Sequence, residues 1–301
     1  MNTKTDIKQL LISYFCFTNK QIMKILKRIL LLVSIVTSLL VIIVYPKLNI
    51  LSGYSAKMTA SSVFLANRTL EFTDANDNNF NLVELADDKV YSKENYATAT
   101  AFGLLTRKAI YREGLGAMVV TNDFDIEAPY LKPKRLTPNN SDPYPYGNAE
   151  PKDSVFESVD YEKLNKTVNS IFNNRNHTRA LVVIHKGKII AEKYRKGFDK
   201  DSRILGWSMT KSIMSTVFGV MQSQGKINVQ DKAPIKEWEN DERQNITIHN
   251  LLQMNSGLEW DENYDDISDA TKMLFLEKDM TKSAIKKPLV GEINNSWYYS
   301  S

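Results

Sequence analysis

The sequence predicts an α+β fold in which helices pack on an antiparallel sheet, after an N-terminal transmembrane helix and a small β-containing extension. Three observations lead to this prediction. A helical pattern at 160–172 is followed by two short apolar runs, 180–184 and 188–194, joined by a tight turn. A second helical pattern then opens at Ser208, and a helix–hairpin–helix order favours helices on an antiparallel sheet. Near the N-terminus, residues 29–45 contain no charge.

Residues 29–45 are predicted to cross a membrane. As a helix this run is about 26 Å long, at the low edge of the hydrocarbon core of a bilayer. Residues 1–28 contain one acidic residue and six basic ones, so they predict a basic cytoplasmic segment. The positive-inside rule then places the remainder outside, as a periplasmic domain on a bacterial inner membrane. The six basic residues are Lys4, Lys8, Lys20, Lys24, Lys27 and Arg28.

A cleaved secretory signal is the main alternative to this anchor. Signal cleavage needs small residues just after the apolar run, but Tyr45, Pro46 and Lys47 follow here, which favours an uncleaved anchor. The segment starting at Met23 resembles the beginning of a signal, so the chain could start at Met1 or Met23.

Composition argues against several classes of function. Apart from the basic N-terminal segment the chain is close to neutral, so a nucleic-acid-binding surface is not supported. Cys16 is the single cysteine, which excludes an intramolecular disulfide and a cysteine-cluster metal site. His177, His185 and His249 lack ligand spacing, so we expect no metal and no cofactor. A Ser-His-Asp triad using one of these histidines remains open, although nothing in the pattern favours it.

Between the anchor and the hairpin, the sequence predicts two segments. Residues 46–122 form a β-containing extension, with strands expected at 96–102, 108–112 and 117–120. Residues 123–153 hold six of the nine prolines, which forbids a continuous helix or a central strand. We expect this stretch to wrap against the next domain, 154–301, through Tyr130, Tyr144 and Tyr146.

In the last domain, local signals define the helix ends. Asp160 is predicted to cap the helix before the hairpin, and Gly225 to end the helix that Ser208 opens. Thr247 is predicted to cap a short helix through Leu252.

Ser208 and Lys211 are the candidate catalytic pair. Residues three apart share one face of a helix. A serine hydroxyl needs a base to take its proton, and an amine is a suitable base where burial or a nearby cation lowers its pKa. Ser-x-x-Lys is therefore the pattern of a nucleophile and its base. The other interpretation of Ser208 is an ordinary residue at a helix N-terminus.

The same spacing occurs twice more, so context has to decide. Residues 223–226 straddle a glycine that ends a helix, and residues 283–286 run into a proline at the end of a polar helix. Only Ser208 follows a turn, at Gly206, and opens a long apolar-periodic run. We expect that helix to bury Lys211 with its first turn.

Several segments together resemble the serine β-lactamase/penicillin-binding superfamily, and within it class C-related hydrolases and 6-aminohexanoate-dimer hydrolase-like enzymes. The resemblance covers roughly residues 155–301. It is carried by GWSMTKS at 206–212, ITIHNLLQMNSGL at 246–258 and WYYSS at 297–301. Residues 100–120 (TAFGLLTRKAIYREGLGAMVV) also resemble the N-terminal extension of the second group.

The resemblance implies an acyl-enzyme mechanism and a β-lactamase/transpeptidase-like fold. Ser208 would attack an amide or ester carbonyl of a small substrate, Lys211 would take its proton, and Tyr299 would relay protons to the leaving group and the deacylating water. The family's Tyr-x-Asn motif aligns with 299–301, where Ser301 replaces the commoner Asn, which fits amide hydrolases better than β-lactamases. Without the resemblance, Tyr299 reads as a core aromatic beside Trp297. The backbone N–H of Ser208 would supply half of the oxyanion hole.

In the superfamily the third motif, Lys-Thr-Gly or His-x-Gly, lies on a strand well after the Tyr motif, whereas this sequence stops at Ser301. We therefore expect a C-terminally truncated chain with an incomplete sheet and an unpaired strand edge. Loss of one oxyanion donor costs about 3–4 kcal/mol in the barrier, so weak turnover is expected.

Two other functions remain compatible with the sequence. The first is a penicillin-binding D-Ala-D-Ala carboxypeptidase, which a fluorescent penicillin would label. The second is a non-catalytic, membrane-anchored binding protein of the same fold. The sequence does not identify the substrate or the oligomeric state.

Overall fold

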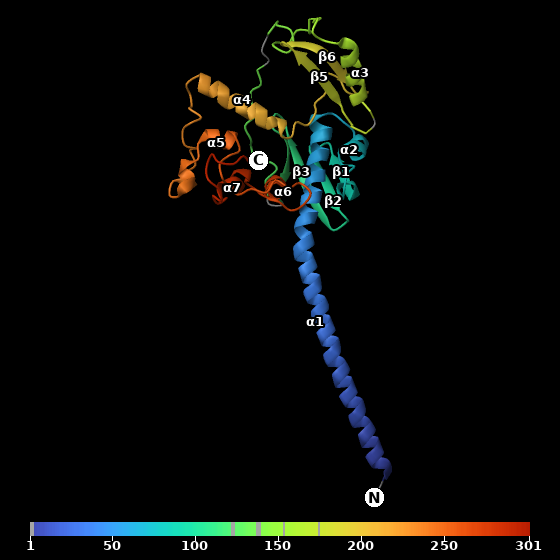
Figure 1. The fold of residues 1–301 in the computed structure, drawn as a ribbon. Coiled ribbons are helices and arrows are strands. Elements are labelled where there is room, and N and C mark those ends of the chain that lie inside the picture. The colour runs from blue at the N-terminus through green and yellow to red at the C-terminus, as the bar shows by residue number, and fades with distance from the viewer. Residues whose placement is uncertain (1–2, 122–123, 137–139, 153, 174) are drawn as a thin grey trace.

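The computed structural model describes residues 3–121, 124–136, 140–152, 154–173 and 175–301. Helix α1 (Thr3–Ala60) runs as one long rod into a folded part made of the remaining elements (Figure 1). It is the one described helix that is long and apolar enough to cross a membrane. Its apolar residues between Ile29 and Val44 are exposed, whereas a core helix would bury them.

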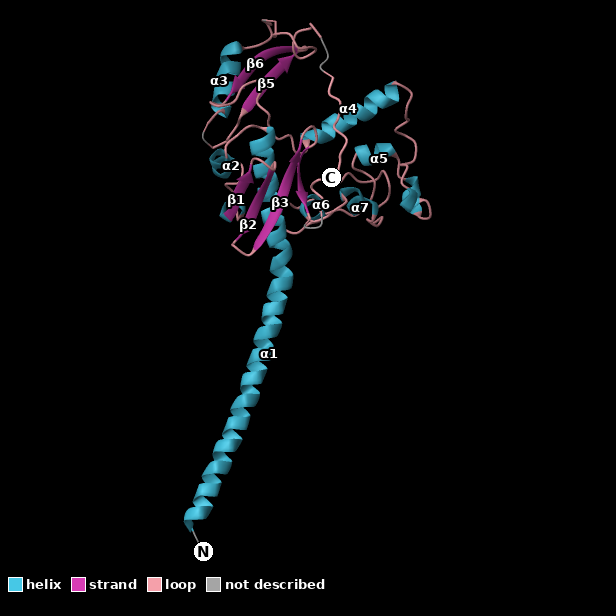
Figure 2. Ribbon diagram, turned by 180° about the vertical axis from the view of Figure 1, so that it is seen from behind, coloured by secondary structure: helices cyan, strands magenta, loops and turns pink. Residues whose placement is uncertain are grey.

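The last turns of α1 pack against a four-stranded antiparallel sheet of order β1-β2-β3-β4 (Figure 2). The strands are β1 (Ala86–Tyr91), β2 (Tyr96–Ala101), β3 (Leu105–Arg112) and β4 (Gly116–Val120). Small side chains let the helix approach the sheet closely. The core between them consists of Ala56, Ala60, Ala97, Ala99 and Ala109, all fully buried.

Three of these strands match the sequence prediction, and β1 was not predicted. The continuation of the predicted membrane anchor as a helix to Ala60 was not predicted either, nor were the short helical elements after it. These are η1 (Ser61–Leu65), α2 (Leu70–Asn76) and η2 (Val83–Leu85).

The described residues of the proline-rich stretch contain no helix or strand. They lie against both neighbouring parts of the chain. The Arg112 guanidinium lies 4.6 Å from the ring centre of Tyr130, and Tyr146 packs so closely on Gly187 that a Cβ there would lie 2.3 Å from its hydroxyl. The domain boundaries drawn from the sequence remain predictions.

The predicted helix and hairpin are present. Helix α3 (Tyr161–Ile171) is capped by Asp160, whose carboxylate accepts from the Lys163 N–H at 2.9 Å. Strands β5 (Ala180–His185) and β6 (Lys188–Tyr194) form a separate two-stranded sheet against which α3 packs. The turn between the strands has two left-handed residues, Lys186 (φ 46°) and Gly187 (φ 71°), as a tight hairpin requires. The α+β prediction is thereby confirmed.

Helix α4 (Met209–Ser223) begins directly after Ser208, and Gly225, which has φ 68°, follows two residues after its end. The expectation that α4 would bury Lys211 with its first turn is wrong, because Lys211 is only partly buried. No residue of α4 is buried, and Met209 and Ile213 are 64% and 65% exposed. The physical reason is that none of the described residues covers this apolar face.

The C-terminal part of the domain is a group of short helices. Trp238 is buried within this group, and its indole N–H donates to the Ile285 carbonyl at 2.9 Å. The group also contacts α1, where Gly53 faces Phe275. Its elements are η3 (Lys236–Trp238), η4 (Glu242–Asn245), α5 (Ile248–Leu252), α6 (Asp269–Phe275) and α7 (Met280–Ile285).

Candidate active site

Ser208 stands at a sharp turn that leads into α4. Trp207, just before it, has a left-handed backbone (φ 43°), which is rare for a bulky residue and costs about 1–3 kcal/mol. Ser208 is the N-cap residue of α4, yet its side chain makes no capping hydrogen bond. Its N–H also has no acceptor among the described residues. Both the hydroxyl and the amide of Ser208 are therefore available to a bound molecule.

Lys211 lies one helical turn further along and faces Ser208. Its Nζ donates to Ser208 Oγ at 3.2 Å and to Ser301 Oγ at 3.0 Å. The hydrogen bond to Ser301 joins residues that are far apart in the sequence. The other Ser-x-x-Lys pairs show no such contact, since Ser223 Oγ bonds the Val220 carbonyl and Ser283 Oγ is buried without a partner.

Tyr299 completes the group around the Lys211 ammonium, which lies 4.8 Å from the centre of the Tyr299 ring. The Ser208 side chain, and after it Lys211, lower the pKa of the Tyr299 phenol despite some desolvation. Tyr299 is held in place through its neighbour, because the Tyr298 N–H donates to the Met254 carbonyl at 2.9 Å. A phenol with a lowered pKa next to a hydroxyl and an amine is suited to exchanging protons with them.

Glu262 is a member of the site that the sequence analysis missed. Its carboxylate accepts from the Ser301 hydroxyl at 2.6 Å and from the Ser301 N–H at 2.9 Å. Trp260 and Tyr264 donate to the same carboxylate. Desolvation raises the pKa of Glu262, but these hydrogen bonds outweigh it and the net pKa is lowered, so the group is held as an anion.

A signal for Glu262 exists in the sequence. Trp260 and Tyr264 lie two positions before and after Glu262, and this local spacing brings two donors to one carboxylate. The link from that carboxylate to Ser301 spans 39 positions, and no local pattern predicts it.

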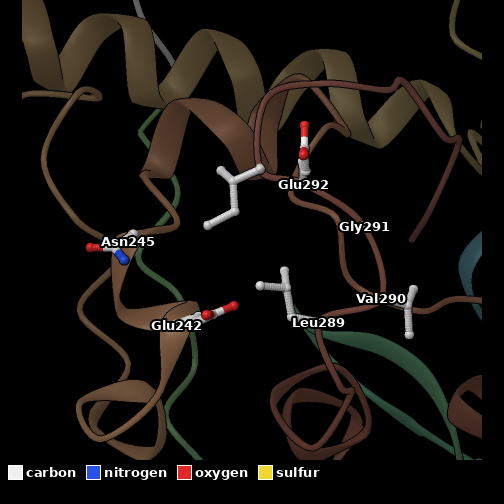
Figure 3. A pocket seen from close by; sticks show the side chains of 7 residues that line it. Glu242, Asn245, Leu289, Val290, Gly291 and Glu292 are labelled. Carbon is white, nitrogen blue, oxygen red and sulfur yellow. The ribbon is translucent and has the colours of Figure 1, made fainter.

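A pocket of about 530 Å³ opens elsewhere in the C-terminal part, between η4 and the loop at 289–293 (Figure 3). The side chains of Glu242 and Leu289 face one another across it (Figure 3). Ser208, Lys211 and Tyr299 do not line this pocket, so its volume says nothing about the candidate site.

The sequence model of the Beta-lactamase family matches residues 169–301. Residues 169–301 belong to the beta-lactamase family. The beta-lactamase domain therefore contains all the polar groups described around Ser208, and the predicted β-lactamase/transpeptidase-like fold is confirmed for it. A comparison with curated proteins gives no match.

The family supports a serine-hydrolase-like function in general, acting on a small molecule. In the beta-lactamase domain, Lys211 contacts both the Ser208 hydroxyl and the Tyr299 ring. Lys211 also donates to Ser301, which in turn donates to the Glu262 carboxylate. This set of groups can supply a nucleophile and pass protons during acyl transfer. The sheet formed by β1–β4 and the end of α1 lie outside the matched range.

Proposed function

We propose that this protein is a serine hydrolase that cleaves amide or ester bonds through an acyl-enzyme on Ser208. The observation that carries the proposal is the 3.2 Å contact between Lys211 Nζ and an Oγ of Ser208 that no capping bond occupies. In an ordinary helix N-terminus the serine hydroxyl would accept from a backbone N–H of the first turn. Here it faces an amine instead.

In the proposed reaction, Lys211 acts in its amine form and accepts the Ser208 proton as Oγ attacks the substrate carbonyl carbon. The Ser208 N–H donates to the oxyanion that forms on the carbonyl oxygen. When the intermediate collapses, the bond to the leaving amine or alcohol breaks and Tyr299 passes a proton to that group. Water then attacks the acyl-enzyme carbonyl carbon, and the Tyr299 phenolate accepts the proton of that water. The bond to Ser208 Oγ breaks, and Lys211 returns the proton that it took, which restores the Ser208 hydroxyl and the Lys211 amine.

For the substrate, we propose small amides or esters of the kind cleaved by 6-aminohexanoate-dimer hydrolase-like enzymes. Support comes from position 301. A serine hydroxyl here accepts from Lys211 while it donates to Glu262. An Asn amide, which is commoner in relatives that bind β-lactams, is larger and offers a second donor to the substrate.

Covalent labelling tests the acyl-enzyme proposal. A fluorophosphonate probe should modify the full chain in detergent at Ser208, as located by peptide mass spectrometry. Ser208→Ala should abolish labelling, and Lys211→Met should slow it by about 100-fold or more, as expected for loss of a general base. Labelling at another residue, or at an unchanged rate in Lys211→Met, would contradict the proposal. Labelling by a fluorescent penicillin at a comparable rate would point to a carboxypeptidase instead.

We further propose that residues 29–45 anchor the protein in a bacterial inner membrane with the hydrolase domain on the periplasmic side. The exposed apolar helix surface and the basic segment before it support this arrangement. Expressed in a bacterium, the chain should stay in the membrane pellet after carbonate washing. Protease added to spheroplasts should digest the domain, and a soluble domain of reduced mass would show cleavage of a signal instead.

A further inference from the structure

The turn that carries Ser208 is held from outside the beta-lactamase domain. The indole of Trp207 stacks on the ring of Tyr54 in α1, with centroids 6.0 Å apart and planes 15° apart. Tyr54 is itself fixed between Phe80, at 5.3 Å, and Phe275, at 5.6 Å. In Figure 1 the start of α4 lies beside the last turns of α1, where this contact occurs.

A second set of contacts holds the start of the same segment. Arg203 donates to the Leu65 carbonyl at 2.9 Å, and Arg68 donates back to the Arg203 carbonyl at 2.8 Å. Arg68 is anchored by Asp77, a carboxylate that is 7% exposed and also pairs with Arg179. The segment from Arg203 to Trp207 is therefore tied at both ends to residues that precede the family match.

The left-handed backbone of Trp207 makes the stacking contact important. A bulky residue keeps a positive φ only where its surroundings impose it. The turn is closed by the Met209 N–H, which donates to Gly206, and the Thr210 N–H, which donates to Trp207. Rotation of Trp207 toward an ordinary φ would break this closure and swing Ser208 away from Lys211.

We propose that Tyr54 is a positioning residue for Ser208: its ring holds Trp207 in the left-handed conformation that directs the Ser208 hydroxyl at Lys211. This inference rests on the proposed function for its catalytic consequence, but its structural part does not depend on catalysis. It assigns to the helix that emerges from the anchor a role in building the active site of the domain that follows it.

The test compares Tyr54→Ala with Tyr54→Phe in the full chain in detergent, through the rate of fluorophosphonate labelling at Ser208. Tyr54→Ala should slow labelling by about 10-fold to 100-fold, since small misplacements of reacting groups have effects of this size. Tyr54→Phe keeps the stacked ring and should label within about twofold of the unmodified chain. Tyr91→Ala is the control: it removes the stacking of Tyr91 on Tyr96 between β1 and β2, and it should leave the labelling rate unchanged.

A Trp207→Gly background separates positioning from general destabilisation. Glycine adopts a left-handed conformation without strain and needs no stacking partner. Tyr54→Ala should therefore slow labelling far less in this background than in the unmodified chain. The proposal is overturned if Tyr54→Ala labels normally, or if it slows labelling equally in both backgrounds.

Amide hydrogen exchange provides a readout that needs no activity. Tyr54→Ala should speed exchange at the Met209 and Thr210 amides, whereas Tyr54→Phe and Tyr91→Ala should not. If the unmodified chain fails to label while exchange responds as expected, the proposed function is wrong and the role of Tyr54 stands. Unchanged exchange in Tyr54→Ala would overturn that role.

Discussion

At the scale of single residues, Glu262 determines how the hydrogen bonds around Lys211 are directed. An ionised carboxylate accepts and cannot donate, so the Ser301 hydroxyl must give its one hydrogen to Glu262. Ser301 Oγ is then left as an acceptor for Lys211. In the proposed reaction, where Lys211 acts as an amine, one of its N–H groups can go to Ser301 and its lone pair can face Ser208.

We predict that Glu262→Gln slows fluorophosphonate labelling of Ser208 by about tenfold, because loss of a charge-assisted hydrogen bond costs about 1.5 kcal/mol. The substitution keeps the shape of the side chain but introduces an amide that can donate. Glu259→Gln is the matched control, since Glu259 is exposed in the same segment. Equal rates for the two variants would show that Glu262 does not position Lys211.

Tyr299 carries a pH-dependent prediction. Its phenol has a lowered pKa because of Ser208 and, next, Lys211. Replacement of Lys211 by methionine removes the cation that favours the phenolate, so Tyr299 should ionise at higher pH. The chain has 14 tyrosines, so ultraviolet titrations should be compared as differences from Tyr299→Phe in each background. A Tyr299 titration that is unchanged by Lys211→Met would contradict this electrostatic coupling.

The sequence predicted the members of the candidate site unequally. Ser208 and Lys211 are close in the chain, so their spacing and the turn at Gly206 were enough to select them from three similar pairs. Tyr299 and Ser301 were predicted through the family resemblance alone, because they approach Lys211 only in the folded chain. Glu262 has two local donors, Trp260 and Tyr264, but its link to Ser301 spans 39 positions, and local reasoning could not predict it.

At the scale of elements, helix ends were predicted best where a side chain caps them. Thr247 and Asn250 form a capping box at the start of α5. Thr247 Oγ1 accepts from the Asn250 N–H at 3.1 Å, and the Asn250 side chain accepts from the Thr247 N–H at 3.0 Å. This reciprocal pair depends on residues three apart, so the sequence contains it in full.

We expect Thr247→Ala to lower the free energy of unfolding by about 1 kcal/mol, the usual cost of losing an N-cap side chain. Urea unfolding followed by tryptophan fluorescence measures the change. Thr216→Ala is the control, because the Thr216 hydroxyl bonds only the Ser212 carbonyl within exposed helix α4. An effect of Thr247→Ala no larger than that of the control would mean that the cap is not needed.

The continuation of α1 to Ala60 and strand β1 were missed for a common reason. The face of α1 that packs on the sheet is made of small residues, among them the buried Ser52, Ser55 and Thr59, which give no apolar periodicity. Strand β1 places the Asp88 carboxylate against that same face, where it accepts a hydrogen bond from the Ser55 hydroxyl. Burial of small polar groups is decided by tertiary partners, which the sequence pattern does not show.

At the scale of the whole molecule, Asp88 couples stability to pH. Burial raises the pKa of Asp88 from 3.8 to about 6, an effect that Asp74 increases and hydrogen bonds from Ser55, Thr59 and Asn78 oppose. Folded Asp88 therefore keeps its proton to higher pH than the unfolded chain does. Its contribution to stability is complete below about pH 4 and is lost as the pH rises through about 6.

We predict that the free energy of unfolding falls by up to about 3 kcal/mol from this group as the pH rises from below 4 to above 6, at 1.36 kcal/mol for each pKa unit. Asp88→Asn should remove this decline in urea unfolding measured across the range. Asp87→Asn is the control, since Asp87 lies on the exposed side of β1 beside Lys89. A decline that persists in Asp88→Asn would assign it to another group.

The unbroken course of α1 also sets where chemistry would take place relative to lipid. Tyr54, on which the nucleophile turn rests, lies about 14 Å along the helix from the end of the apolar run at Tyr45. Lys47, just past that run, pairs with Asp266 at 2.9 Å, so the loop that includes Glu262 is tied to the same stretch of helix. If the chain is anchored as proposed, a continuous helix rather than a flexible linker joins the membrane to the domain. The Ser208 hydroxyl would then stay at a fixed distance from the bilayer surface.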